Sequence, residues 1–262
     1  VDQSSGFGDV GGFFSINDTQ TPTDKKYNEA MKAFLNLADY TAVRNIPSKK
    51  VCEYMGVKAL YRPDWVFGLQ KDTCDQIKKD WRRMIVVIRE YGQQHEDLIG
   101  LKIWMEKVRS YAEKLGMYIK FLPFCAEDAN YLRRHGLYSQ DSVIDGEYWN
   151  PRRAKQWIAN SGMVVTMGRF HPVVFAISEG TPVISIDYNF DHYRNKGCVL
   201  MEDSCLGQFV LNKLDQQRDV YDLFKEAITE NNKAKIASIG ATNKKLVLRM
   251  KDEILKILTP SL

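Results

Sequence analysis

The segment MVVTMGRFHPVVFAISEGTPVISI, residues 163–186, has the clearest secondary-structure pattern in the chain. Its residue pattern predicts a buried strand, an apolar helix and a second buried strand, at residues 163–166, 171–179 and 182–186. Gly168 allows a sharp turn after the first strand, and Pro172 has the fixed φ that suits the first turn of a helix. This order of elements is typical of a parallel sheet whose strands are joined by helices.

The same alternation continues upstream as far as residue 84. Short apolar runs at residues 84–88 and 118–122 predict two more buried strands. Helices are predicted at residues 96–115, 127–135 and 151–160, with Gly116 ending the first of them. The pattern indicates an α/β fold of the doubly wound, Rossmann-like kind, a parallel sheet with helices on both faces.

The chain before residue 84 and its last helix predict a second, smaller α/β unit. Its elements are expected as a helix at 24–38, a strand at 41–43 and a helix at 48–55. We expect a partial N-terminal α/β domain at residues 1–75 and a Rossmann-like domain at residues 76–262. The polar stretch at 71–83 is predicted to connect them, with the last helix, 233–258, packing back on the N-terminal domain.

Composition and charge exclude several classes of protein. The 262 residues contain no apolar run near the ~20 residues that a bilayer-spanning helix needs. The five cysteines form no C-x-x-C pair, and His95, His135 and His192 lack metal-ligand spacing, so we predict no disulfide framework, no metal and a cytoplasmic protein. The net charge of +4 is spread along the chain, which argues against nucleic acid as a partner.

A glycine pattern near the start resembles a dinucleotide fingerprint only formally. Gly6, Gly8 and Gly11 have the G-x-G-x-x-G spacing, but no apolar strand precedes them and no helix follows directly. We therefore predict a loop here and no bound cofactor.

The loop after the strand at 163–166 is the predicted site of chemistry. A helix start favours anions, and Arg169 offers a permanently charged fork for carboxylate or phosphate. His171 can exchange a proton near neutral pH, so the pair would suit an anionic substrate that must be protonated. The alternative is a structural histidine beside a surface arginine. Arg89 and Glu90, after the strand at 84–88, are further ligand candidates or a solvated pair.

Two stretches resemble the polysaccharide pyruvyl transferase family. Residues 159–186 are similar to its R-x-H core, in which Gly-Arg-x-His follows a strand and Gly-x-Pro-Val-Ile follows the helix. Residues 34–67 resemble its "aDy-x-x-vRD-x-x-S" block, with Asn45 where the family usually has Asp. The resemblance covers most of residues 34–215, and the first part of the family's N-terminal domain is expected to be missing.

This resemblance implies two Rossmann-like domains in a GT-B-like arrangement, the N-terminal one incomplete. It implies transfer of a pyruvyl group from phosphoenolpyruvate to a sugar diol, forming a ketal in surface polysaccharide biosynthesis such as that of an exopolysaccharide. The acceptor would be a saccharide or a lipid-linked saccharide. Arg169 would clamp the donor, the backbone N–H of Phe170 would assist it, His171 would be the general acid, and Arg44 would contact the anion.

One position of the family pattern has two possible alignments. Many relatives carry a lysine after the strand at 182–186, and a gapped alignment places Arg194 there, whereas an ungapped one places Asp191. We prefer Arg194, because a cation suits a bound trianion. The rival functions are a glycosyltransferase of the same architecture with a nucleotide-sugar donor, and a non-catalytic sugar-binding relative.

Overall fold

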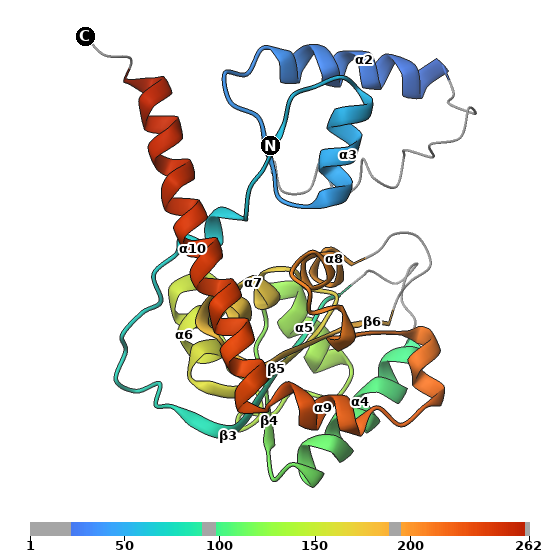
Figure 1. Ribbon diagram of the computed structural model, residues 1–262. Coiled ribbons are helices and arrows are strands. Elements are labelled where there is room, and N and C mark those ends of the chain that lie inside the picture. The colour runs from blue at the N-terminus through green and yellow to red at the C-terminus, as the bar shows by residue number, and fades with distance from the viewer. Residues whose placement is uncertain (1–21, 91–97, 189–194, 260–262) are drawn as a thin grey trace. The chain divides into compact units, whose positions relative to one another are not determined.

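The computed structural model describes residues 22–90, 98–188 and 195–259. The chain divides into two compact units (Figure 1). The smaller unit comprises Val1–Trp65 and Lys244–Leu262, and the larger one comprises Val66–Asn243. The glycines at 6, 8 and 11 lie outside the described residues.

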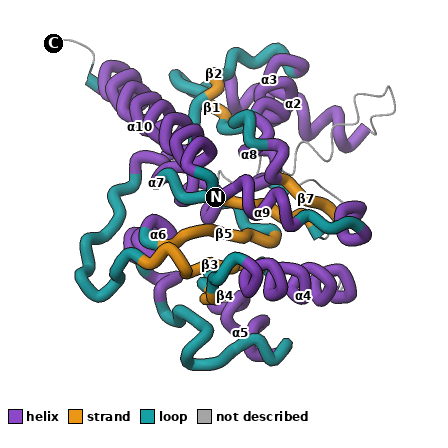
Figure 2. Tube along the Cα trace, turned by 60° about the horizontal axis from the view of Figure 1, so that its bottom comes forward, coloured by secondary structure: helices purple, strands orange, loops and turns teal. Residues whose placement is uncertain are grey.

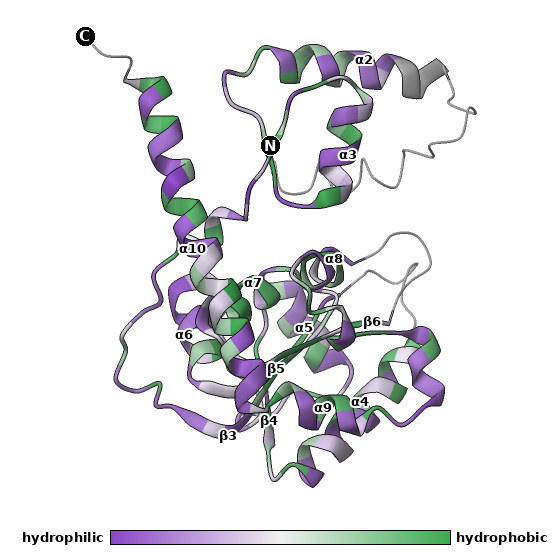
Figure 3. Ribbon diagram, in the orientation of Figure 1, coloured by the Kyte–Doolittle hydropathy of each residue, from purple (hydrophilic) through white to green (hydrophobic). Residues whose placement is uncertain are grey.

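A parallel sheet forms the centre of the larger unit. Within the described residues it has five strands in the order β4-β3-β5-β6-β7. They are β3 (Asp80–Ile88), β4 (Tyr118–Phe121), β5 (Ser161–Met167), β6 (Val183–Asp187) and β7 (Val210–Asn212). Every residue of β5 and β6 is buried, which agrees with their largely apolar sequences, drawn mostly in green in Figure 3.

Helices flank this sheet, as the purple segments around the orange strands of Figure 2 show. Helices α6, α7 and α8 pack side by side, and α4 packs against α9 through Tyr111, whose ring lies 5.0 Å from that of Phe224. The bounds are α4 (Leu98–Lys114), α5 (Ala126–Arg134), α6 (Pro151–Ala159), α7 (His171–Glu179), α8 (Lys196–Asp203) and α9 (Tyr221–Ala227). Short 3-10 helices are η1 (Trp65–Gly68), η2 (Glu147–Trp149), η3 (Gly207–Phe209) and η4 (Lys213–Gln217).

The strand order reverses between β3 and β5. The chain runs from β3 outward to β4, and then returns to the other side of β3 to form β5. At their carboxyl ends the two strands remain bonded, because Arg89 N donates to the carbonyl of Met167 over 2.9 Å. Such a reversal is where doubly wound sheets bind ligands, since the connecting loops diverge there.

The smaller unit is a short α/β assembly. It contains α2 (Pro22–Asn36), β1 (Ala42–Val43), α3 (Ile46–Tyr54) and β2 (Leu60–Tyr61), and β1 pairs with β2 in parallel. Its core consists of buried residues from these elements: Leu35, Val43, Val51, Cys52, Met55 and Val57.

Helix α10 (Glu230–Leu258) contributes to both units. Near its start it packs closely on α7, since a Cβ atom at Gly240 would lie 2.1 Å from the carbonyl oxygen of Ile177. Near its end, Glu253 accepts hydrogen bonds from Tyr40 over 2.9 Å and from Arg62 over 3.0 Å. The hydrogen bond from Arg62 holds the pKa of Glu253 below its ordinary value.

The structure confirms the predicted fold class, with each predicted strand and helix present within a few residues of its expected bounds. The predicted connection at residues 71–83 is wrong. Asp72 N donates to Arg152 O, Cys74 and Gln156 exchange two hydrogen bonds, and residues 80–83 belong to β3. This polar stretch resembles a linker in composition, but its backbone groups are bonded to α6.

Candidate functional site

The turn between β5 and α7 has the conformation that its sequence requires. Gly168 has a φ of +90°, which residues with a Cβ rarely adopt. The Thr166 hydroxyl donates to the carbonyl of Arg169 over 3.0 Å and holds the turn closed. Phe170 is the N-cap residue of α7, and His171 is its first residue, followed by Pro172. The turn therefore lies at the carboxyl edge of the sheet, beside the reversal between β3 and β5.

Arg169 is bonded to a carboxylate from another part of the unit. Its Nε donates to Oδ2 of Asp128 over 3.0 Å, and its Nη2 donates to Oδ1 over 2.5 Å. Nη2 also donates to Sγ of Cys125 over 2.8 Å. The Asp128 side chain is 1% exposed and that of Arg169 is 26% exposed. One edge of the guanidinium fork is thus occupied within the protein.

Asp128 was not a candidate from the sequence. It lies in the first turn of α5, where an acidic residue has the ordinary role of complementing the helix dipole. Its position soon after a predicted strand indicated that Asp128 lies at this edge of the sheet. No sequence pattern indicated that it pairs with an arginine 41 residues later.

Asp128 stabilises the charged form of Arg169. Burial opposes the positive charge of Arg169, but the hydrogen bond and attraction from Asp128 outweigh it, and the pKa of Arg169 is raised above its ordinary value. Burial, assisted by the negative charge of Asp128, raises the pKa of the Cys125 thiol to about 11. Cys125 is therefore a neutral thiol at physiological pH, and Asp128 provides the counter-charge.

His171 and Phe170 are both partly exposed at the start of α7. Their rings meet edge to face, with centroids 5.3 Å apart. Pro172 and the rest of the first turn are buried, so the histidine lies where the buried helix meets the surface. Arg169, Phe170 and His171 are thus presented together, on one turn.

Arg44 lies on a similar turn in the smaller unit. It follows β1, and its Nη1 donates to Oδ2 of Asp64 over 2.5 Å. The next residue, Asn45, is the N-cap of α3, and its side-chain oxygen accepts from Ser48 N over 2.7 Å. Asparagine and aspartate are equally good N-caps, so the departure from the family pattern leaves the local structure intact.

The remaining candidates within the described residues are Arg89 and Glu90. Arg89 and Glu90 lie at the end of β3, and Glu90 pairs with Arg134 over 2.5 Å. Tyr188 is fully buried, and its hydroxyl donates to the carbonyl of Arg89 over 3.1 Å. Arg194 and Asp191 lie outside the described residues.

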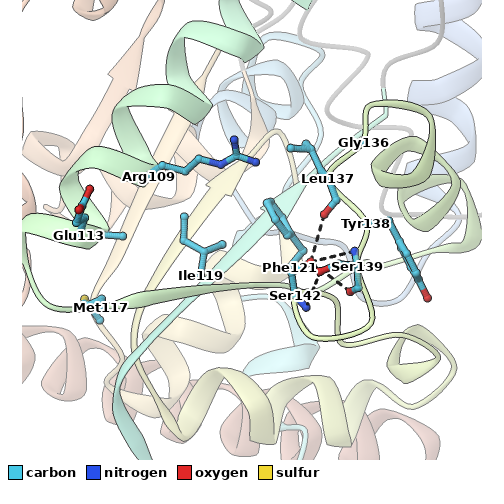
Figure 4. A pocket seen from close by; sticks show the side chains of 11 residues that line it. Arg109, Glu113, Met117, Ile119, Phe121, Gly136, Leu137, Tyr138, Ser139 and Ser142 are labelled. Carbon is cyan, nitrogen blue, oxygen red and sulfur yellow. Dashed lines mark hydrogen bonds between the residues drawn. The ribbon is translucent and has the colours of Figure 1, made fainter.

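An open cavity of about 410 Å³ lies elsewhere in the larger unit (Figure 4). It is bounded by the C-terminal half of α4, by β4 and by the segment after α5. Its lining includes Arg109, Glu113, Phe121, Tyr138 and Ser142, and no candidate residue named above. The chemistry predicted from the sequence is therefore not associated with this cavity.

Residues 22–90, 98–188 and 195–259 contain neither a candidate metal site nor a candidate membrane span. No group of three or more His, Cys, Asp or Glu side chains has an arrangement that could hold a metal ion. No helix in these ranges combines the length and apolarity needed to cross a bilayer.

The solved structures that the chain resembles in fold include the following two. The glycotransferase of kitacinnamycin matches with a TM-score of 0.52 and 10% identity, over 90% of this chain and 63% of that one. A TarM mutant from S. aureus, in complex with fondaparinux, alpha-GlcNAc-glycerol and UDP, matches with a TM-score of 0.50 and 14% identity, over 95% of this chain and 48% of that one. This chain thus spans less than two thirds of either, and the likeness concerns the fold alone.

Sequence comparison identifies the family. No curated protein matches the chain. The family model described as polysaccharide pyruvyl transferase matches residues 12–189, which is more than half of the chain and includes both the Arg44 turn and the Arg169 turn. The chain belongs to the polysaccharide pyruvyl transferase family.

Proposed function

We propose that this protein transfers a pyruvyl group from phosphoenolpyruvate to two hydroxyls of a saccharide. The observation that carries the proposal is the position of Arg169 and His171, on one turn at the carboxyl edge of a doubly wound sheet. Both side chains are partly exposed there, next to the strand-order reversal where such sheets bind ligands. Membership of the family supports the choice of donor and of a saccharide acceptor.

In the proposed reaction, His171 as an imidazolium protonates the methylene carbon of phosphoenolpyruvate. The π electrons form the new C–H bond, and positive character develops at the neighbouring carbon. A sugar hydroxyl adds to that carbon and returns its proton to His171. The bond between that carbon and the phosphate ester oxygen then breaks, and its electrons leave with phosphate. The second hydroxyl adds to the same carbon, and its proton goes to the departing phosphate. The products are the cyclic ketal and inorganic phosphate.

Arg169 contacts the donor in this proposal through the part of its guanidinium that Asp128 does not use. A guanidinium fork matches carboxylate and phosphate oxygens, and hydrogen bonds to such charged groups are about twice as strong as neutral ones. The backbone N–H of Phe170 and the side chain of Arg89 are additional proposed contacts for the anion, and Arg194 is the proposed equivalent of the family lysine. No cofactor is required, because phosphoenolpyruvate itself carries the transferred group.

Ligand-dependent unfolding tests the donor. A ligand at concentration L that binds only the folded state stabilises it by RT ln(1 + L/Kd), so the stabilisation grows with the logarithm of the ligand concentration. We expect phosphoenolpyruvate to raise the Tm of the full chain and nucleoside-diphosphate sugars to leave it unchanged. Stabilisation by a nucleotide sugar alone would instead favour a glycosyltransferase, and binding of a saccharide without any phosphate release would favour a non-catalytic relative.

Substitution of the histidine tests the chemistry. General acid catalysis contributes about 10²- to 10⁴-fold, so His171→Gln is expected to lower acceptor-dependent phosphate release by at least about 100-fold. His135→Gln is the matched control, since His135 is exposed at the end of α5, where its ring contacts that of Tyr131 at a tilt of 45°. Turnover of folded His171→Gln within about tenfold of the wild type would remove His171 from the mechanism.

A further inference from the structure

We propose that Asp128 is the positioning residue of this site: it orients the Arg169 guanidinium so that Nη1 faces the anionic donor. The inference rests on the proposed function for the identity of that donor. Its structural basis is separate, and consists of the bonds that join three strand ends through one carboxylate.

Each carboxylate oxygen of Asp128 accepts one bond from Arg169 and one from a backbone N–H. Oδ1 accepts from Arg169 Nη2 and, over 3.3 Å, from Glu90 N. Oδ2 accepts from Arg169 Nε and, over 3.1 Å, from Phe124 N. Glu90 follows β3, Phe124 follows β4 and Arg169 follows β5. A single side chain therefore ties together the carboxyl ends of three neighbouring strands at the reversal of strand order.

This arrangement determines the orientation of the guanidinium. Bonds through Nε and Nη2 fix both the position and the plane of the fork, whereas a single bond would leave it free to rotate. Within the described part of the chain, the hydrogen bonds of the Arg169 side chain use only Nε and Nη2. Nη1 is not among the buried side-chain atoms that lack a partner, and the side chain keeps 26% exposure. The two N–H groups of Nη1 are therefore directed to the accessible side.

Burial makes the arrangement rigid before any ligand arrives. Asp128 is 1% exposed and held by two backbone N–H groups, so it cannot follow the arginine if the latter turns. A donor group that is already in place loses less conformational entropy when the ligand binds. The opposite charge of Asp128 also keeps Arg169 charged in its partly desolvated position.

The test measures binding of phosphoenolpyruvate to the full chain by titration calorimetry. Asp128→Asn keeps the size of the side chain but replaces one acceptor oxygen by an N–H donor, which must face a donor of Arg169 or of the backbone. We expect affinity for phosphoenolpyruvate to fall by about tenfold, within the range of coupling between contacting polar groups.

Asp215→Asn is the matched control. Asp215 accepts from Arg218 Nε over 2.7 Å and from Asn212 N over 2.8 Å, so it combines the same two kinds of bond on η4. We expect this variant to bind phosphoenolpyruvate as the wild type does. Equal weakening by both substitutions would attribute the effect to general loosening of the unit and overturn the inference.

A double-mutant cycle separates positioning from a merely structural role. An ammonium has no planar fork for Asp128 to orient. In the Arg169→Lys background, Asp128→Asn should therefore change the affinity by less than about threefold, a clear departure from additivity. Additive effects of the two substitutions would contradict the proposal, as would folded Asp128→Asn protein that binds within twofold of the wild type.

Two further measurements apply if Asp128→Asn does not fold or if the wild type does not bind phosphoenolpyruvate. If Asp128→Asn does not fold, Asp128→Glu retains the charge but displaces it by one methylene, and unchanged affinity in that variant would overturn the inference. If the wild type does not bind phosphoenolpyruvate, the proposed function fails by itself. Positioning is then judged from the Nε–H signal of Arg169 in NMR spectra, expected to be protected from exchange in the wild type and unprotected in Asp128→Asn.

Discussion

Two turns of the molecule, one in each unit, have the same plan. In the smaller unit β1 leads to Arg44, the N-cap Asn45, Ile46 and then Pro47 in the first turn of α3. In the larger unit β5 leads through Gly168 to Arg169, the N-cap Phe170, His171 and then Pro172 in the first turn of α7. In both, an arginine directly precedes the N-cap residue, and an aspartate from another segment accepts its hydrogen bond.

The two turns differ in how the helix start is capped. Asn45 caps α3 with its own side chain, whereas among the described residues no side chain caps α7. Asp64 accepts a hydrogen bond from Nη1 of Arg44, and Asp128 accepts from Nε and Nη2 of Arg169. The comparison shows that the same sequence plan can give a capped helix start in one unit and a partly exposed histidine beside an oriented guanidinium in the other.

The largest effect is expected from breaking the Arg169 pair. Arg169→Met leaves the 1% exposed Asp128 without its counter-charge, which should destabilise the protein by about 3 kcal/mol. Urea unfolding measures this loss. The double variant Arg169→Met with Asp128→Asn should recover part of the stability, because the uncompensated charge is gone. An unchanged unfolding midpoint in the single variant would show that this pair is no stronger than a surface one.

The next effect concerns which group balances the charge of Arg169. Because the pKa of Cys125 is raised to about 11, its thiolate should be about 100-fold scarcer at pH 7–8 than that of a thiol of pKa 9. Alkylation of Cys125 should be slow at pH 8 and accelerate as the pH rises toward 11, whereas the exposed Cys205 serves as the reference thiol. Fast labelling of Cys125 at neutral pH would identify a thiolate, and not Asp128 alone, as the counter-charge.

Gly168 distinguishes the two turns in backbone conformation. Its φ of +90° makes Gly168→Ala strained, at a cost of about 2 kcal/mol. The strain should also displace Arg169, so affinity for phosphoenolpyruvate should fall along with the Tm. Gly136→Ala is a suitable control, because Gly136 also has a positive φ, +64°, but lies beyond the end of α5. A loss of Tm at unchanged affinity would separate the turn from the orientation of Arg169.

A smaller effect is expected at the corresponding pair of the smaller unit. The Asp64 side chain is 10% exposed whereas that of Asp128 is 1% exposed, so water can solvate the Asp64 carboxylate more readily once its arginine is removed. Arg44→Met should reduce the free energy of unfolding by about 1 kcal/mol, measured by the same urea titration. Destabilisation equal to that of Arg169→Met would remove the distinction that we draw between the two turns.

The smallest effect is expected at Asn45. Asn45→Asp should alter the free energy of unfolding by less than about 0.5 kcal/mol, because both side chains cap a helix equally well, and Asn45→Ala should cost about 1 kcal/mol. Phosphoenolpyruvate binding by Asn45→Asp should equal that of the wild type. A large gain in affinity would show that the family aspartate has a role in the site beyond capping α3.

Local patterns in the sequence determined the elements and the turn that carries the candidate residues. Buried parallel strands are rich in apolar residues, a sharp turn with positive φ favours glycine, and the first turn of a helix accepts proline. Residues 163–186 meet these conditions in order, and they therefore predicted β5, the turn at Gly168, α7 and β6. For the same reason Arg169 and His171 could be selected as candidates before any contact was known. The prediction of a linker at residues 71–83 rested on their polar composition alone. Composition does not show that Cys74 in this stretch is hydrogen-bonded to Gln156 of α6.

Only the tertiary structure decided what surrounds Arg169. The order β4-β3-β5 brings the loop after β4 next to the loop after β5, and thereby places Asp128 against an arginine 41 residues later in the chain. Periodicity describes which face of an element is buried, but it does not specify which strands become neighbours. The partner of a buried charge depends on that neighbourhood, since the carboxylate must lie within hydrogen-bond distance of the guanidinium to offset the loss of solvation.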